Sequence, residues 1–279
     1  MNVATREPAS PTRFLLRMTT LIVLLFLIAP IVVVFPLSFS SGELLTLPTP
    51  GYSLRWYEDF FTSSKWLLAT KNSFIVGIAT AVLATFLGTL AALGIFLGRF
   101  RGKALLVGIL STPMVVPVVV TAAAMYFGFA LVGLNNTLAG LILAHTVLSV
   151  PYVLITVLAT LQTFDRNLLK AAATLGAPPH VAFLRIVLPL ILPGVATGAL
   201  FAFATSFDEL VVALFIASPE QFTLPRQMYA GLREFLSPTI TAAAVLLILC
   251  SLLLLGLNEW IRARAKARSL PLGDPAEPN

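Results

Sequence analysis

Two adjacent acids, Asp208 and Glu209, interrupt an otherwise apolar stretch. They are the side chains in this sequence that are best suited to binding a charged ligand. Carboxylates accept hydrogen bonds from ammonium groups, and aromatic ring faces attract cations. The pair is therefore a candidate site for an organic cation. The candidate aromatic partners are Phe201, Phe203, Phe207 and Tyr126.

Other interpretations of the two acids are open. One acid could form an ion pair with Arg226, with Arg233 or with a base on another chain, since charges in apolar surroundings tend to pair. The acids could also cap a broken helix or bind a protein that delivers a substrate. Consecutive helical residues point about 100° apart, so we expect at most one acid to face a central path.

The sequence contains no recognisable catalytic or metal-binding set. His145 and His180 lie in different segments, and Cys250 is a single cysteine in an apolar run. The segment 98–104 is one residue too short for a phosphate-binding loop, and Ala104 replaces the hydroxyl residue that binds Mg²⁺. We therefore expect no enzyme activity, no metal site and no cofactor in this chain. If the chain is part of an ATP-driven pump, a partner must supply the site for ATP and Mg²⁺.

The composition predicts a membrane protein. Hydrophobic residues make up 58% of the 279 positions, charged residues make up 11%, and the mean hydropathy is +0.95. These values exclude a soluble globular domain, a disordered chain and a disulfide-stapled secreted domain.

Uncharged tracts long enough to cross a bilayer predict an all-α protein with six transmembrane helices. The tract 104–164 is too long for one span, and its turn at 133–136 divides it in two. The fifth span is expected to continue past Asp208 and Glu209. The six predicted spans are 15–38, 71–97, 105–131, 138–160, 190–217 and 238–260.

The basic residues predict the orientation. One set of segments between the spans holds 13 of the 18 Lys and Arg residues, and the positive-inside rule places that set in the cytoplasm. We expect a cytoplasmic segment 1–14, a membrane domain 15–260 and a cytoplasmic tail 261–279. The basic tail is interpreted as an anchor at the lipid headgroups and not as a nucleic-acid site.

The cytoplasmic loop 161–189 has a distinctive pattern. Its first part favours a short helix that Asp165 can cap, and Gly176 is placed to end this helix in a left-handed conformation. Pro178 and Pro179 suit the first turn of a second helix, which is expected to end near 188–189. By itself this pattern also fits a helical hairpin that only connects two spans.

The same loop resembles the signature of ABC importer permeases, which reads E-A-A, three residues, Gly, nine residues and I-x-L-P. Lys170 replaces the usual Glu, which removes any salt bridge that the Glu would make. The resemblance implies that this loop docks on an ATPase subunit. The residues assigned to coupling are Leu168, Lys170, Ala171, Ala172, Leu175, Gly176, Ile186, Leu188 and Pro189.

Further stretches, at 53–57, 113–117 and 206–238, resemble the spermidine/putrescine branch of the family. The resemblance implies a type I ABC importer permease fold in a bacterial inner membrane. It also implies a second permease subunit, two ATP-binding subunits and a periplasmic substrate-binding protein. Two alternatives remain: an ABC importer for another cationic solute, such as an amino-acid or opine-like compound, and an ion-coupled secondary transporter. A membrane-embedded enzyme would need a catalytic set that is not found.

Overall fold

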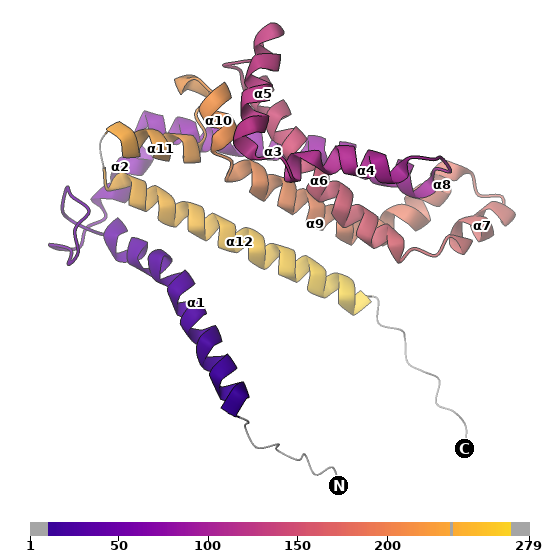
Figure 1. The fold of residues 1–279 in the computed structure, drawn as a ribbon, viewed down its shortest axis with the longest axis horizontal. Coiled ribbons are helices and arrows are strands. Elements are labelled where there is room, and N and C mark those ends of the chain that lie inside the picture. Colours follow the sequence, from indigo (N-terminus) through magenta and orange to yellow (C-terminus); the bar gives the residue numbers. More distant parts are fainter. Residues whose placement is uncertain (1–10, 235–236, 269–279) are drawn as a thin grey trace. The chain divides into compact units, whose positions relative to one another are not determined.

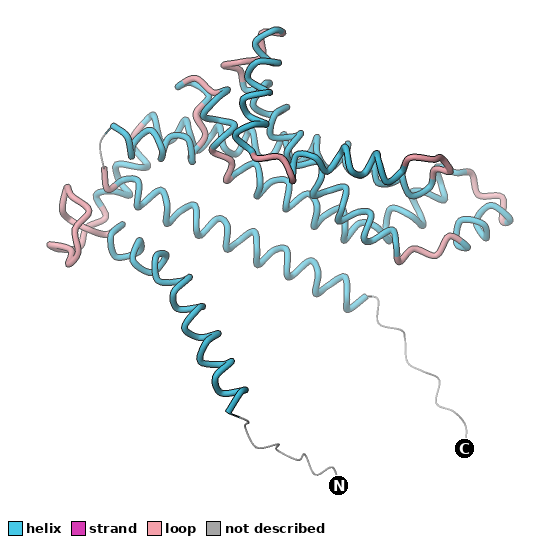
Figure 2. The backbone as a smooth tube through the Cα atoms, viewed as in Figure 1, coloured by secondary structure: helices cyan, strands magenta, loops and turns pink. Residues whose placement is uncertain are grey.

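The computed structural model describes residues 11–234 and 237–268, and these residues are almost entirely helical (Figure 2). Apart from an isolated β-bridge between Ser40 and Tyr52, the described residues form helices and loops. Parts of the predicted cytoplasmic segments, 1–10 and 269–279, lie outside the described residues. The chain separates into two compact units, which are described one at a time.

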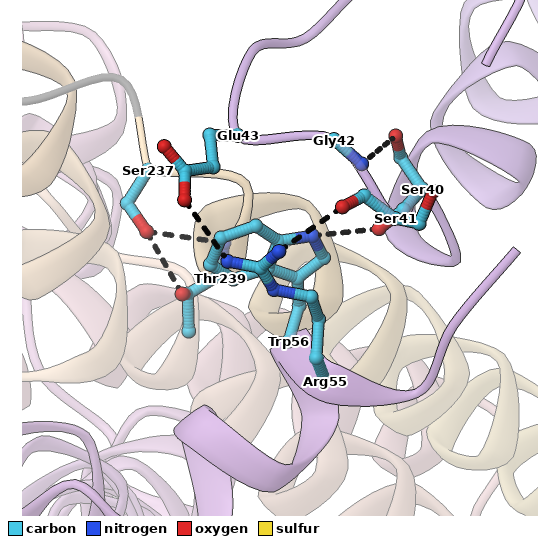
Figure 3. Close-up of polar contacts among 8 residues, drawn as sticks. All are labelled: Ser40, Ser41, Gly42, Glu43, Arg55, Trp56, Ser237 and Thr239. Carbon is cyan, nitrogen blue, oxygen red and sulfur yellow. Dashed lines mark hydrogen bonds and ion pairs between the residues drawn. The ribbon is translucent and has the colours of Figure 1, made fainter. Parts of the chain in front are cut away.

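The first unit comprises the chain up to Thr62 together with Gly231–Leu247. Helix α1 (Pro11–Ser38) is the first apolar span, and α2 (Arg55–Thr62) follows the loop after it. The indole N–H of Trp56 donates to the Ser40 carbonyl at 2.8 Å, and Arg55 pairs with Glu43 at 3.5 Å (Figure 3). These bonds hold the loop 40–54 back against the start of α2.

The second unit is built on three long helices that lie side by side: α3 (Ser64–Leu97), α6 (Leu138–Gln162) and α9 (Leu188–Phe207) (Figure 1). Small residues allow close packing. A Cβ added at Gly88 would lie 2.7 Å from Val153 Cβ, and one at Gly198 would lie 3.0 Å from Val153 Cα. Helix α6 therefore packs tightly between α3 and α9, as is common where membrane helices meet.

The expected third span is not one straight helix. It consists of α4 (Lys103–Ser111), a 3₁₀ turn η1 (Thr112–Met114) and α5 (Val118–Leu131), with a bend of 96°. Pro113 and Pro117 lie at the break, where each removes a backbone donor and Pro117 directly precedes α5. The predicted turn before α6 is present, with positive φ at Gly133 (70°) and Asn136 (59°).

The expected fifth span is shorter than predicted. Helix α9 ends at Phe207, and a separate helix α10 (Val211–Ile216) begins after a break. The prediction of one continuous helix over 190–217 was therefore wrong.

The remaining elements are shorter helices and turns, apart from the long helix at the end of the described chain. They are α7 (Asn167–Thr174), α8 (Pro179–Ala182), a π-helical turn η2 (Phe183–Val187), η3 (Pro219–Gln221), α11 (Leu224–Glu234) and α12 (Thr239–Arg268).

Among the described residues, five helices are long and apolar enough to cross a membrane, and the bent α4–α5 pair makes six if it forms one span. The observed spans agree with the predicted ones within a few residues at most ends. The principal differences are the two breaks, at 112–117 and at 208–210.

Candidate functional site

Helix α7 forms the first half of the loop 165–189, and side-chain and backbone bonds close both its ends. The Asp165 carboxylate accepts the N–H of Asn167 at 2.9 Å, as the sequence predicted. At the other end, Gly176 has φ = 75°. Its N–H donates to Ala173 O, and the N–H of Ala177 donates to Ala172 O, each at 3.0 Å. This pair of bonds is a Schellman motif, which needs a left-handed residue at the Gly176 position.

One side of α7 is buried and another side presents apolar groups. Ala172 is buried, whereas Leu168 is 42% exposed and Leu175, just past the helix, is 86% exposed. Lys170 and Ala171 are also exposed, and the Lys170 ammonium donates to Asn167 Oδ1 at 3.3 Å. The Lys170 ammonium therefore lies over the first turn of α7.

The second helix of the loop was expected to end near Leu188 and Pro189, but it continues into α9. Helix α8 starts at Pro179, with Pro178 as its N-cap, and leads through η2 directly into α9. The N–H of Leu188 donates to Phe183 O, five residues back. Pro189 has no N–H and its ring would crowd the carbonyl four residues earlier, so the wider π turn accommodates it. Ile186 is half-buried in this turn.

Asp208 and Glu209 lie at the break between α9 and α10. The Glu209 carboxylate accepts the N–H of Val212 at 2.7 Å and so caps α10, which is one of the alternatives left open by the sequence. Asp208 follows the last residue of α9, and its side chain is exposed. The two acids therefore have different surroundings, with Glu209 held by the backbone and Asp208 accessible.

An aromatic cluster precedes this break. The Phe207 ring is 4% exposed and stacks on Phe203 with ring centroids 5.3 Å apart. The centroid of the Phe74 ring, on α3, lies 5.2 Å from the centroid of the Phe207 ring. Gly77 leaves room for the cluster, because a Cβ there would lie 2.9 Å from the Phe203 ring. Tyr126 lies on α5, where its exposed ring packs edge-on against Phe127.

His145 forms a hydrogen bond between two helices. Its Nδ1 lies 2.8 Å from the Ser206 hydroxyl, and both side chains are buried. This bond joins α6 to the last turn of α9, two residues before Asp208. It thus fixes the end of the helix from which the acids project.

Sequence reasoning missed two buried polar residues at the start of α3. Asn72 donates to the carbonyls of Glu220 (2.9 Å) and Phe222 (3.1 Å), and the Ser73 hydroxyl accepts the N–H of Leu224 at 2.7 Å. These bonds attach the segment after α10 to α3. The signal was present, since adjacent polar side chains in an apolar helix tend to bond within the protein.

Glu220 lies in this same attached segment, between α10 and α11. The Ser218 hydroxyl donates to the Glu220 carboxylate at 2.6 Å and lowers the pKa of that carboxyl below its usual value. This exposed acid therefore stays ionised at neutral pH.

Comparisons with known proteins agree on a family. The family model described as "Binding-protein-dependent transport system inner membrane component" matches residues 84–267. The spermidine/putrescine transport system permease protein PotC of Haemophilus influenzae is 33% identical, over 90% of this chain and 97% of that protein. The putrescine transport system permease protein PotI of Escherichia coli K12 is 32% identical, over 88% and 89%.

A solved structure has the same fold. The bacterial alginate ABC transporter, in complex with an alginate pentasaccharide-bound periplasmic protein, matches with a TM-score of 0.67 and 18% identity. The match covers 90% of this chain and 94% of that chain. The fold is therefore the all-α, type I ABC importer permease fold expected from the loop motif. On this evidence the chain belongs to the family of inner-membrane components of binding-protein-dependent transport systems.

Proposed function

We propose that this chain is the permease subunit of an ATP-driven importer of polyamines such as putrescine and spermidine. The observation that carries the proposal is its similarity to polyamine permeases along nearly their whole length. The chain would form half of the translocation path, with a second permease subunit forming the other half. A periplasmic binding protein would deliver the substrate.

The proposed coupling surface is the exposed side of α7. Burying a fully exposed leucine side chain contributes about 1.5–3 kcal/mol, so docking of Leu168 and Leu175 in a groove of an ATPase subunit would be favourable. The exposed Ala171 lets the partner approach closely, and Lys170 can pair with an acid at the edge of the groove. Two such ATPase subunits would supply the ATP and Mg²⁺ sites, so this chain itself would not be an enzyme.

The proposed orientation places both termini and the loop 165–189 in the cytoplasm. The support is the positive-inside distribution, with 13 of 18 basic residues in the segments on that side. With six spans, the loop 40–54 and the segment 217–224 would then face the periplasm.

The proposed substrate path passes the break after α9. Asp208 offers an accessible carboxylate to an ammonium group, and Phe74 and Phe203 offer partly exposed rings that pack against the buried Phe207. Glu209 would contribute charge while its carboxylate caps α10. Tyr126 on α5 is a second aromatic candidate.

Uptake of labelled putrescine and spermidine by energised cells, with and without this chain, tests the proposal. Loss of saturable uptake on deletion, restored by the wild-type chain, is the expected result. Unchanged uptake in a strain lacking other polyamine importers would contradict the polyamine assignment and favour another cationic solute. Uptake that continues in ATP-depleted vesicles holding an ion gradient would instead favour a secondary transporter.

A further inference from the structure

One face of α12 carries a shallow apolar groove that the transport function does not use. The groove has a volume of about 770 Å³. Its residues recur at intervals of three and four, which places them on one side of the helix. Leu252 is 56% exposed and Leu253 is 75% exposed. The groove is lined by Leu249, Leu252, Leu253, Gly256, Leu257 and Trp260.

A missing side chain creates the notch in this groove. Gly256 lies within the helix, and a Cβ added there would meet nothing within 4 Å. The side chains of the neighbouring leucines therefore project beyond the helix backbone at Gly256, and the space over Gly256 is empty. A flexible hydrocarbon chain can fill such a surface without displacing any atom of the protein.

One end of the groove is basic. Arg264 lies one turn beyond Trp260, and its guanidinium carbon is 3.8 Å from the centroid of the indole ring. A guanidinium stacked on a ring keeps its edge N–H groups free to donate to an anion. Arg262 differs, because it pairs with Glu259 at 3.6 Å and is nine residues, or two and a half turns, from Leu253. Arg262 therefore points away from the groove.

The groove matches the depth of one leaflet. The eleven-residue separation of Leu249 and Trp260 corresponds to about 17 Å at 1.5 Å per residue. Half of the hydrocarbon core of a bilayer is about 15 Å. With Trp260 at the level of the headgroups, where tryptophan is enriched, Arg264 reaches the phosphates. The apolar groove thus lies at the depth of the acyl chains, and the Arg264 guanidinium lies at the depth of an anionic headgroup.

We propose that this face of α12 binds an acidic phospholipid from the leaflet at the basic end of the helix. An acyl chain lies along the groove past Gly256, and Arg264 donates to the phosphate. Charge complementarity favours the acidic lipid, because its headgroup has a net negative charge, whereas the cationic group of a zwitterionic headgroup cancels the phosphate charge and is repelled by Arg264. The lipid would thereby act as a structural ligand of the permease.

Photolabelling of the complete transporter in phosphatidylcholine nanodiscs tests this proposal. The probes are phosphatidylglycerol and phosphatidylcholine, each with a photoactivatable diazirine on one acyl chain. The expected result is stronger labelling of the peptide 249–260 by the phosphatidylglycerol probe. Gly256→Leu fills the notch and should lower the labelling of this peptide by the phosphatidylglycerol probe.

Two matched charge variants identify the cation. Arg264→Gln should reduce the preference for phosphatidylglycerol about fivefold, which corresponds to about 1 kcal/mol for one basic side chain near an anionic surface. Arg262→Gln removes the same charge from the opposite face and should leave the preference unchanged. Equal labelling by the two probes, or equal loss in both variants, would overturn the proposal. The proposal would also be overturned if this face of α12 took up no lipid label and instead crosslinked to the second permease.

Discussion

Replacement of Gly176 tests whether backbone conformation in the loop 165–189 controls coupling. Gly176 has φ = 75°, and a Cβ at this position would meet no atom within 4 Å. The cost of a side chain is therefore conformational and not steric. For a residue with a Cβ, the left-handed conformation costs about 1–2 kcal/mol. That cost reduces the population of the Schellman geometry by about 5- to 30-fold.

A series of substitutions separates this effect from contact with a partner. Asparagine tolerates the left-handed region, alanine tolerates it less well, and β-branched valine tolerates it least. We expect ATP-driven uptake and substrate-stimulated ATPase activity to fall in the order Gly176, Gly176→Asn, Gly176→Ala and Gly176→Val. Gly108→Ala is the matched control, because that position in α4 is equally open and lacks a positive φ.

The assay uses the transporter reconstituted with its ATPase and binding protein, at equal amounts of inserted permease. Loss of both activities in Gly176→Val, with normal insertion, is the expected result. Normal coupling in Gly176→Val would refute the reasoning. Equal loss in Gly176→Asn and Gly176→Val would show that the size of the side chain matters instead of φ.

Three further predictions concern the helices that carry the candidate path. Glu209→Ala removes the cap of α10 and should lower the unfolding free energy by about 1 kcal/mol, measured as a lower melting temperature; Glu209→Gln keeps an acceptor oxygen, and if it kept both stability and full uptake the charge of Glu209 would have no role. Gly198→Val should separate α6 from α9 and cost about 1–3 kcal/mol, whereas Gly128→Ala, in open space, should leave the melting temperature unchanged. His145→Ala and Ser206→Ala should show a coupling energy of about 0.5–1.5 kcal/mol in a double-mutant cycle on stability, and purely additive effects would contradict the interhelical bond.

The fold could be predicted because its signals are strong and local. Uninterrupted apolar tracts located most spans to within a few residues, and positive φ angles occur at 133 and 136 in the predicted turn. The left-handed Gly176 and the proline start of α8 follow from cap chemistry that a single sequence displays. In each of these cases the deciding interaction lies within a few residues along the chain.

The breaks were harder to predict because hydropathy does not report helix ends inside the membrane. The residues 211–217 are as apolar as α9, so average hydropathy continues across Asp208 and Glu209. The alternative that the acids cap a broken helix was open from the sequence, since a carboxylate near a first turn is a common cap, but the sequence did not decide between it and a continuous helix. At 112–117 the two prolines lie at the break, but the sequence does not give the size of the bend, and η1 also packs against α6 in the fold.

The contacts of Asn72 and Ser73 were beyond sequence reasoning for a different reason. Their partners lie about 150 positions away along the chain, at Glu220, Phe222 and Leu224. Only the packing of α3 against the segment after α10 brings these groups together. A polar pair in an apolar helix predicts that a bond exists, and the fold is needed to identify the partner.

The most direct test of the central claim is transport by the purified complex in proteoliposomes. The complex contains this chain, its partner permease and the ATPase. ATP is enclosed in the vesicles, and the binding protein with labelled polyamine is added outside. We expect labelled putrescine or spermidine to accumulate on the ATP side, only when both ATP and the binding protein are present. Polyamine transport that follows an ion gradient without ATP, or no polyamine transport by an active complex, would contradict the account.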